Sequence, residues 1–141
     1  MKKSITVQAG QQSVWKAILN YRASQPHRRR MVSQTENVTV MEESFTGLPM
    51  VGTSRLVYEE VEHPFEKITF KLVEGQHLSK FHGSWKLVPS ADGRTCAVHI
   101  DAEFDTNLPV PFKENILNQL AEMDIGKRLA YVKQQAEADK D

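Results

Sequence analysis

Hydrophobic and polar residues alternate with a period of two through most of residues 31–106. This alternation is typical of strands that bury one face and expose the other. The last stretch shows it most clearly, because every second side chain from Cys96 to Phe104 is apolar. Turn-forming residues divide the region, so the pattern predicts five consecutive antiparallel strands. The expected strands are residues 31–46, 51–62, 65–74, 80–88 and 95–105.

The segment before these strands predicts one strand and one helix. Residues 4–8 alternate and indicate a short first strand. Large apolar side chains then recur at helical spacing in residues 11–20, so we expect an amphipathic helix there. Residues 21–30 contain Pro26, which would interrupt a long helix. This segment therefore predicts either a short second helix or an irregular turn.

A long helix is expected at the C-terminal end, over residues 111–138. Apolar residues recur there near helical spacing among Lys, Gln and Glu. Pro109 and Pro111 suit the approach to a helix start. Gly126 lies inside the helix, where glycine costs about 1 kcal/mol relative to alanine, so we expect a kink or a close packing contact. The recurring apolar residues are Leu117, Leu120, Leu129, Val132 and Ala136.

Together these elements predict an α+β fold in a single domain, residues 1–141. Adjacent strands with one apolar face form a meander whose apolar side needs a cover, and the C-terminal helix can provide it. We expect a curved antiparallel sheet of about six strands wrapped around that helix, with one or two short helices after the first strand. A chain of 141 residues has the usual size of one domain.

Composition excludes several classes of function. The 18 basic and 18 acidic residues give no net charge, so we expect no broad nucleic-acid surface. The single cysteine, Cys96, excludes an internal disulfide and a multi-cysteine zinc site. The sequence shows no signal peptide and no run of about 18 apolar residues that could form a transmembrane segment. We therefore expect a cytoplasmic protein.

The sequence contains no established catalytic or metal-binding motif. An HExxH motif, a GxSxG nucleophile elbow and a phosphate-binding loop are all missing, and the five histidines form no ligand cluster. We therefore assign no catalytic residue, no metal and no cofactor. Arg28, Arg29 and Arg30 form the only concentrated charge. Their guanidinium groups could bind an anionic headgroup or RNA, but we interpret the run as a solvated loop.

Three stretches of the chain resemble the SRPBCC or START-like superfamily. Residues 13–20 (SVWKAILN) resemble its opening helix, and residues 68–75 (ITFKLVEG) with 81–89 (FHGSWKLVP) resemble its central strand pair. Residues 93–109 and the last helix resemble its closing elements. The resemblance extends to polyketide cyclase/dehydrase-type and coenzyme Q-binding-type proteins. The chain departs from the pattern at residues 21–30, where arginines replace an aromatic-rich element.

The resemblance implies a helix-grip fold with a cavity between the sheet and the C-terminal helix. Apolar walls with a few polar groups suit a hydrophobic small molecule, and Tyr58 and Ser54 could be the polar anchors. Leu117 and Leu120 are expected to face the strands from the helix. The expected ligand-binding residues are Leu56, Tyr58, Ile68, Phe70, Leu72, Phe81, Trp85, Val98, Ile100, Phe104, Leu117 and Leu120.

Three functions are open at this point. The favoured one is binding or transport of a lipid, quinone or polyketide-like molecule by a monomer or homodimer without enzymatic activity. The alternative is a cyclase or dehydratase that acts on an aromatic polyketide and needs an acid and a base. The sequence offers no clear ionisable pair on the inner face for that chemistry. The third is a ribosome- or protein-binding module, which only residues 28–30 support.

Overall fold

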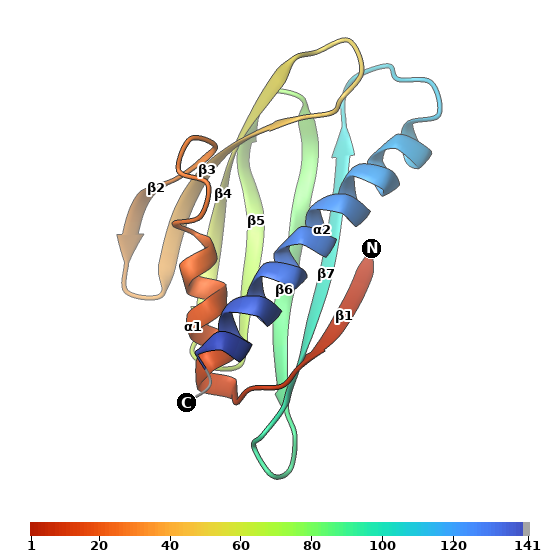
Figure 1. The fold of residues 1–141 in the computed structure, drawn as a ribbon. Coiled ribbons are helices and arrows are strands. Elements are labelled where there is room, and N and C mark those ends of the chain that lie inside the picture. Colours follow the sequence, from red (N-terminus) through yellow and green to blue (C-terminus); the bar gives the residue numbers. More distant parts are fainter. Residues whose placement is uncertain (140–141) are drawn as a thin grey trace.

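A curved antiparallel sheet and a long helix form the two layers of the fold (Figure 1). The computed structural model describes residues 1–139. The strand order is β1-β7-β6-β5-β4-β3-β2, so β2 to β7 form a meander and β1 is added beside β7. The strands are β1 (Lys2–Val7), β2 (Arg29–Thr35), β3 (Val38–Thr46), β4 (Thr53–His63), β5 (Lys67–Gly75), β6 (Leu78–Pro89) and β7 (Cys96–Thr106). The helices are α1 (Gln11–Tyr21) and α2 (Lys113–Ala138).

The expected α+β helix-grip architecture is confirmed, but the sheet has seven strands instead of about six. Residues 31–46 are not one strand, because the chain reverses at Glu36, which has a φ of 47°, and β2 pairs back on β3. After Arg29 every side chain of β2 is exposed. In its sequence, RRMVSQT, the apolar residues Met31 and Val32 are adjacent and so lie on opposite faces, and alternation could not mark β2 as a separate strand. Residues 22–28 form turns, so α1 is the one helix between β1 and β2.

Helix α2 crosses the concave side of the sheet and packs against α1, β1 and β7 (Figure 1). Its buried side chains recur every three or four residues, as an amphipathic helix requires. The helix continues through Gly126, where an added Cβ atom would meet no other atom within 4 Å. Gly126 therefore makes no close packing contact, which was one of the two alternatives expected there. The buried stripe consists of Leu117, Ala121, Ile125, Leu129, Val132 and Ala136.

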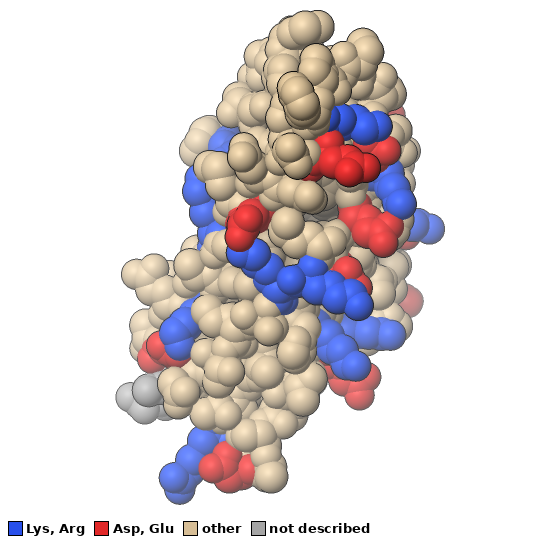
Figure 2. Space-filling view, turned by 90° about the vertical axis from the view of Figure 1, so that its right-hand side faces the viewer, with Lys and Arg blue, Asp and Glu red and all other residues tan. Residues whose placement is uncertain are grey.

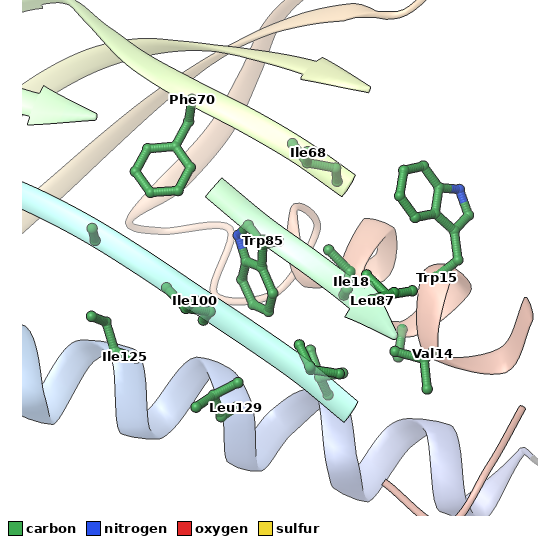
Figure 3. Close-up of a cluster of buried hydrophobic side chains, with 14 of the residues drawn as sticks. Val14, Trp15, Ile18, Ile68, Phe70, Trp85, Leu87, Ile100, Ile125 and Leu129 are labelled. Carbon is green, nitrogen blue, oxygen red and sulfur yellow. The ribbon is translucent and has the colours of Figure 1, made fainter. Parts of the chain in front are cut away.

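The core lies between α2 and the inner faces of the central strands. In Figure 3, Ile125 and Leu129 of α2 point toward Ile100 of β7, and Trp85 of β6 lies beside them. All four side chains are buried. Burying each large side chain of this kind contributes about 1.5–3 kcal/mol, so this layer supplies much of the stability of the fold.

Gly83 in the middle of β6 makes room for one aromatic ring of the inner face. A Cβ atom at this position would lie 1.9 Å from the carbonyl oxygen of Asp101 and 2.8 Å from Cζ of Phe70. Phe70 is the partner of Gly83 across the β5–β6 pair. The missing side chain therefore lets the Phe70 ring lie against the backbone of the sheet.

Candidate functional site

A cavity of about 210 Å³ lies between the sheet and α2. Strands β3, β4, β6 and β7 contribute to it from the inner face of the sheet, and the loop of residues 47–52 contributes Leu48. Most ligand pockets have volumes of about 300–1,000 Å³, so this cavity is small and suits the apolar part of a ligand. Its apolar walls include Leu48, Leu56, Leu78, Phe81, Phe104 and Leu117.

The cavity borders an end of the molecule that carries no charged residue. Residues 46–53 and 106–112 contain no Asp, Glu, Lys or Arg. Met50 and Phe112, one from each stretch, are 88% and 81% exposed. Figure 2 shows this end as uncharged at the top, whereas acidic and basic side chains are interspersed below it. Leu48 of the cavity wall belongs to the first of these stretches.

A second, deeper void of about 20 Å³ lies further along the inner face. Tyr58 and Glu60 of β4 line it together with core side chains. Phe81, Asp124 and Arg128 line both this void and the larger cavity. The two spaces therefore adjoin at these three side chains.

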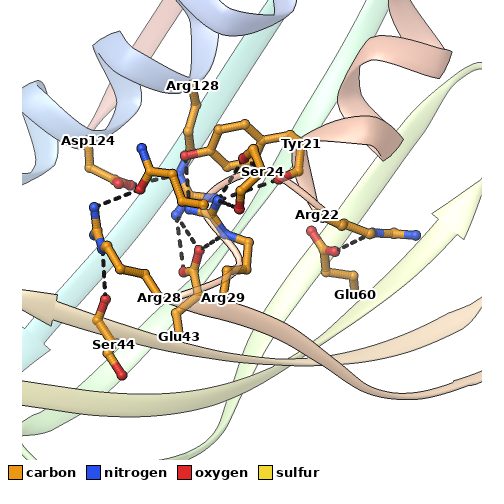
Figure 4. Close-up of polar contacts among 11 residues, drawn as sticks. Tyr21, Arg22, Ser24, Arg28, Arg29, Glu43, Ser44, Glu60, Asp124 and Arg128 are labelled. Atoms are coloured by element: carbon orange, nitrogen blue, oxygen red, sulfur yellow. Dashed lines mark hydrogen bonds and ion pairs between the residues drawn. The ribbon is translucent and has the colours of Figure 1, made fainter.

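A buried ionic network closes the polar side of the cavity (Figure 4). Glu43 accepts a hydrogen bond from Nε of Arg29 and two from Nη2 of Arg128, at 3.1 and 3.2 Å. Nε of Arg128 donates to Oδ2 of Asp124 at 2.8 Å. The side chains of Arg29 and Glu43 are 3% and 8% exposed. The network joins β2, β3 and α2 across the interior.

Tyr21 at the end of α1 completes this network. The guanidinium carbons of Arg29 and Arg128 lie 4.1 and 4.9 Å from its ring centroid, within the range of cation–π attraction. Its hydroxyl accepts a hydrogen bond from Nη2 of Arg29 at 3.0 Å. Arg29 also donates to the hydroxyl of Ser24. Nearly every donor of Arg29 is used, so its role in the structure is to hold the segment after α1 against the sheet.

A second ion pair lies beside the inner void. Nε of Arg22 donates to Glu60 at 2.8 Å, and its Nη1 donates to Glu62 at 2.9 Å. Nη2 of Arg22 and Oγ1 of Thr39 are buried without a hydrogen-bond partner among the described residues. Thr39 pairs with Glu60 across β3 and β4. Polar groups thus cluster around Glu60 in β4.

The two buried glutamates are shifted in opposite directions. Burial alone would raise the pKa of Glu43, but Arg128 and Arg29 outweigh it and lower that pKa below its ordinary value. Burial raises the pKa of Glu60 above its ordinary value, and Arg22 only partly opposes it. Burial also raises the pKa of Tyr58 well above its ordinary value. Glu43 is therefore an ionised partner of arginines, whereas Glu60 and Tyr58 retain protons more readily.

The structure distributes the twelve residues expected to bind a ligand over three places. The larger cavity is lined by Leu56, Phe81, Phe104, Leu117 and Leu120. The inner void is lined by Tyr58, Phe70, Trp85 and Ile100, and also by Phe81. Ile68, Leu72 and Val98 line neither space and pack in or against the core. A ligand-binding role for these residues stays a prediction.

Leu120 lies at the larger cavity with Phe81 and Phe104, not at the inner void near Phe70 and Trp85. Its Cδ2 atom would lie only 2.5 Å from a Cβ atom at Gly47, so it packs under the loop between β3 and β4. The side chains of α2 that line the inner void near Phe70 and Trp85 are Asp124, Ile125 and Arg128.

The interpretation of residues 28–30 as a solvated loop is wrong for Arg29. Its side chain is buried in the network, whereas the Arg30 side chain is 65% exposed and pairs with Glu42. Arg28 is half-buried and lines the larger cavity. The run therefore does not form one exposed basic patch, and Arg29 is not accessible to RNA or to a protein partner.

The absence of an ionisable pair on the inner face was also a wrong expectation. In β3 the buried face carries Thr39, Met41 and Glu43, while Val38 and Val40 are half-buried on the other face. Val38 and Val40 favour their own side of this strand as the apolar face, so the buried position of Glu43 on the other side was not expected. Met41, in the same alternation as Glu43, was the one sequence signal that could have revealed it.

Histidine chemistry is limited in the structure. Nδ1 of His77 lies 2.7 Å from Oγ of Ser54, and Ser54 lines neither space. Within residues 1–139, no three or more His, Cys, Asp and Glu side chains are arranged to hold a metal ion. The same part of the chain has no helix that is both long and apolar enough to cross a membrane.

A family model described as polyketide cyclase/dehydrase and lipid transport matches residues 1–137. No curated protein sequence matches the chain significantly. Among solved structures, the Thermus thermophilus protein TTHA0849 has a TM-score of 0.83 at 14% identity, with 100% of this chain and 99% of that chain covered.

Two further solved structures extend this comparison. The Zhui aromatase/cyclase from a Streptomyces species has a TM-score of 0.84 at 13% identity and covers 97% of this chain and 92% of its own. A START superfamily protein from Mycobacterium smegmatis has a TM-score of 0.67 at 14% identity, with coverages of 99% and 95%. At these identities the similarity shows the fold alone.

Proposed function

Because the chain belongs to the polyketide cyclase/dehydrase and lipid transport family, we propose that it binds a hydrophobic small molecule between its sheet and α2. The molecule is a lipid, a quinone or a polyketide-like compound. The observation that carries the proposal is the cavity of about 210 Å³, in which Leu and Phe side chains make up half of the lining residues. Each 100 Å² of apolar ligand surface that it removes from water contributes about 2.5 kcal/mol to binding.

The position of the cavity supports exchange of ligand with the surroundings. It is partly open, and it lies next to the uncharged end formed by residues 46–53 and 106–112. An apolar molecule can approach this end without displacing water from charged groups. The small size of the cavity means that part of a larger ligand would remain at the opening.

Replacing Leu120 with aspartate is expected to weaken binding of a neutral apolar fluorescent probe at least about tenfold, because a charge then lies in the apolar wall. Leu120 is half-buried at the cavity, so this variant is less prone to unfold than a core variant. Gln119→Asp is the matched control, since Gln119 is exposed and lines neither space. Equal probe affinity in both variants would contradict binding in this cavity.

Native mass spectrometry of protein purified from its own host addresses the natural ligand. A retained small molecule, lost from the Leu120→Asp variant, supports the proposal and gives the mass of the ligand. Co-purified RNA or ribosomes without any small molecule would instead favour a ribosome-binding module.

The inner void supports a second candidate, a cyclase or dehydratase. Tyr58 and Glu60 line this void, and burial raises the pKa of both groups. A carboxyl group with a raised pKa can donate a proton to a carbonyl or hydroxyl group near neutral pH and take it back. Cyclisation and dehydration of a polyketide both need such transfers.

If the protein is such an enzyme, Glu60→Gln is expected to lower kcat for a poly-β-ketone substrate about 100-fold with little change in KM. In the unmodified protein the rate should fall as pH rises through the pKa of Glu60, since the protonated acid is then lost. Glu59→Gln is the control, because Glu59 is the adjacent residue and lines neither space. Turnover that survives in Glu60→Gln would exclude Glu60 as the acid.

A further inference from the structure

We propose that the ligand is an amphipathic anion whose acidic group binds beside Arg28, Lys127 and Arg128, which we call the basic wall of the cavity. This inference rests on the proposed binding function and adds the chemical class of the ligand. All three basic side chains line the larger cavity, together with its apolar residues. A single molecule in this space would therefore contact both.

The carboxylates at the cavity neutralise only Arg128 of the basic wall. Glu43 is engaged by Arg29 and Arg128, and Asp124 is engaged by Arg128. These two carboxylates balance the charges of Arg29 and Arg128. Within residues 1–139 neither Arg28 nor Lys127 has a carboxylate partner, because Arg28 donates only to a neutral amide and a carbonyl group. Two positive charges at the cavity are thus uncompensated.

The basic wall also has hydrogen-bond donors that the described residues leave unused. Arg128 donates hydrogen bonds from Nε and Nη2. Arg28 donates hydrogen bonds from Nε and Nη1, and Figure 4 shows its bond to Ser44. One amino nitrogen of each guanidinium group and the ammonium group of Lys127 have no partner in residues 1–139. Guanidinium groups match the paired oxygens of a carboxylate or phosphate, and a bond to an oxyanion is about twice as strong as a neutral one.

The spacing along α2 separates the acidic group from the apolar part of the ligand. Leu120 and Lys127 line the same cavity and are seven residues apart, which is about 10 Å along a helix. An acidic group at Lys127 therefore leaves room for an apolar chain or ring system toward Leu120 and Phe104. A neutral quinone or alcohol would fill the apolar part but would leave the basic wall without a partner.

Decanoate and decan-1-ol form a matched pair for the test, since they share a chain length and differ in charge. Each displaces a neutral apolar fluorescent probe from the full-length protein near neutral pH. We expect decanoate to bind at least about tenfold more tightly than decan-1-ol. Raising the salt concentration from about 20 mM to about 500 mM should weaken decanoate binding and leave decan-1-ol binding unweakened. Decyl phosphate in a parallel series distinguishes a phosphate from a carboxylate headgroup.

The double variant Arg28→Gln/Lys127→Gln should abolish the preference for the anion and keep the affinity for decan-1-ol. Arg128 is left intact because it belongs to the buried network. Lys86→Gln is the control, since Lys86 is exposed on β6 and lines neither space. Decan-1-ol binding as tightly as both anions, or a double variant that weakens all three equally, would overturn the anion proposal alone. Failure of all three compounds to displace the probe would count against the proposed binding function as well.

Discussion

Replacing Arg29 with serine is expected to lower the free energy of unfolding by about 3–5 kcal/mol, because it removes one partner from a buried ion pair. Glu43 would keep Arg128 as its counter-charge, but the hydroxyl group of Tyr21 and the backbone at Ser24 would lose their partner. Urea denaturation followed by circular dichroism measures the change.

Arg30→Ser is the matched control for this prediction. Arg30 is the next residue, its side chain is 65% exposed, and its one carboxylate contact is with Glu42. An exposed ion pair of this kind contributes about 0–1 kcal/mol. Equal loss of stability in the two variants would show that Arg29 is not part of a buried network.

Replacing Leu129 with aspartate has the second large expected effect. Leu129 is 5% exposed and points from α2 toward Ile100 (Figure 3). The substitution removes apolar contact and buries a carboxylate among apolar side chains, so we expect the domain to unfold or to lose at least about 4 kcal/mol. The near-ultraviolet circular dichroism of Trp15 and Trp85 reports the loss of tertiary packing.

Ala130→Asp separates the effect of position from that of charge. Ala130 is the next residue of α2 and is exposed, so aspartate there costs only its lower helix propensity, about 0.7 kcal/mol or less. A Leu129→Asp variant that folds as cooperatively as Ala130→Asp would mean that α2 does not cover the sheet.

The sequence predicted the architecture well because apolar alternation is strong where strands are buried on one side only. The alternation from Cys96 to Phe104 predicted a strand of the sheet, and the apolar stripe of α2 predicted the helix that covers it. The family resemblance predicted the order of the elements. Strand β2 was missed because its side chains after Arg29 are polar or exposed on both faces. The hydrophobic pattern of a segment cannot reveal a strand that is specified only by its hydrogen bonds to a neighbouring strand.

The candidate site could be predicted only in its apolar part. Residues such as Phe81, Phe104 and Leu117 follow from periodicity, because their strands and α2 each have one apolar face. The polar part depends on contacts between distant residues, and charged residues are exposed in most sequences. Nothing near Arg29 or Glu43 in the sequence indicates that Arg128 will pair with Glu43 at the cavity.

The bond between Arg128 and Glu43 joins residues that are 85 positions apart in the chain. Local hairpins such as β2–β3 close short loops, whereas this contact requires the sheet to be formed and the last helix to dock on it. The basic wall is assembled only when α2 docks, because Arg28 precedes β2 whereas Lys127 belongs to α2. A folding intermediate without the docked helix would therefore have a hydrophobic sheet but no binding site. Ligand present during refolding would stabilise only chains in which α2 has already docked, so it would affect only the last step.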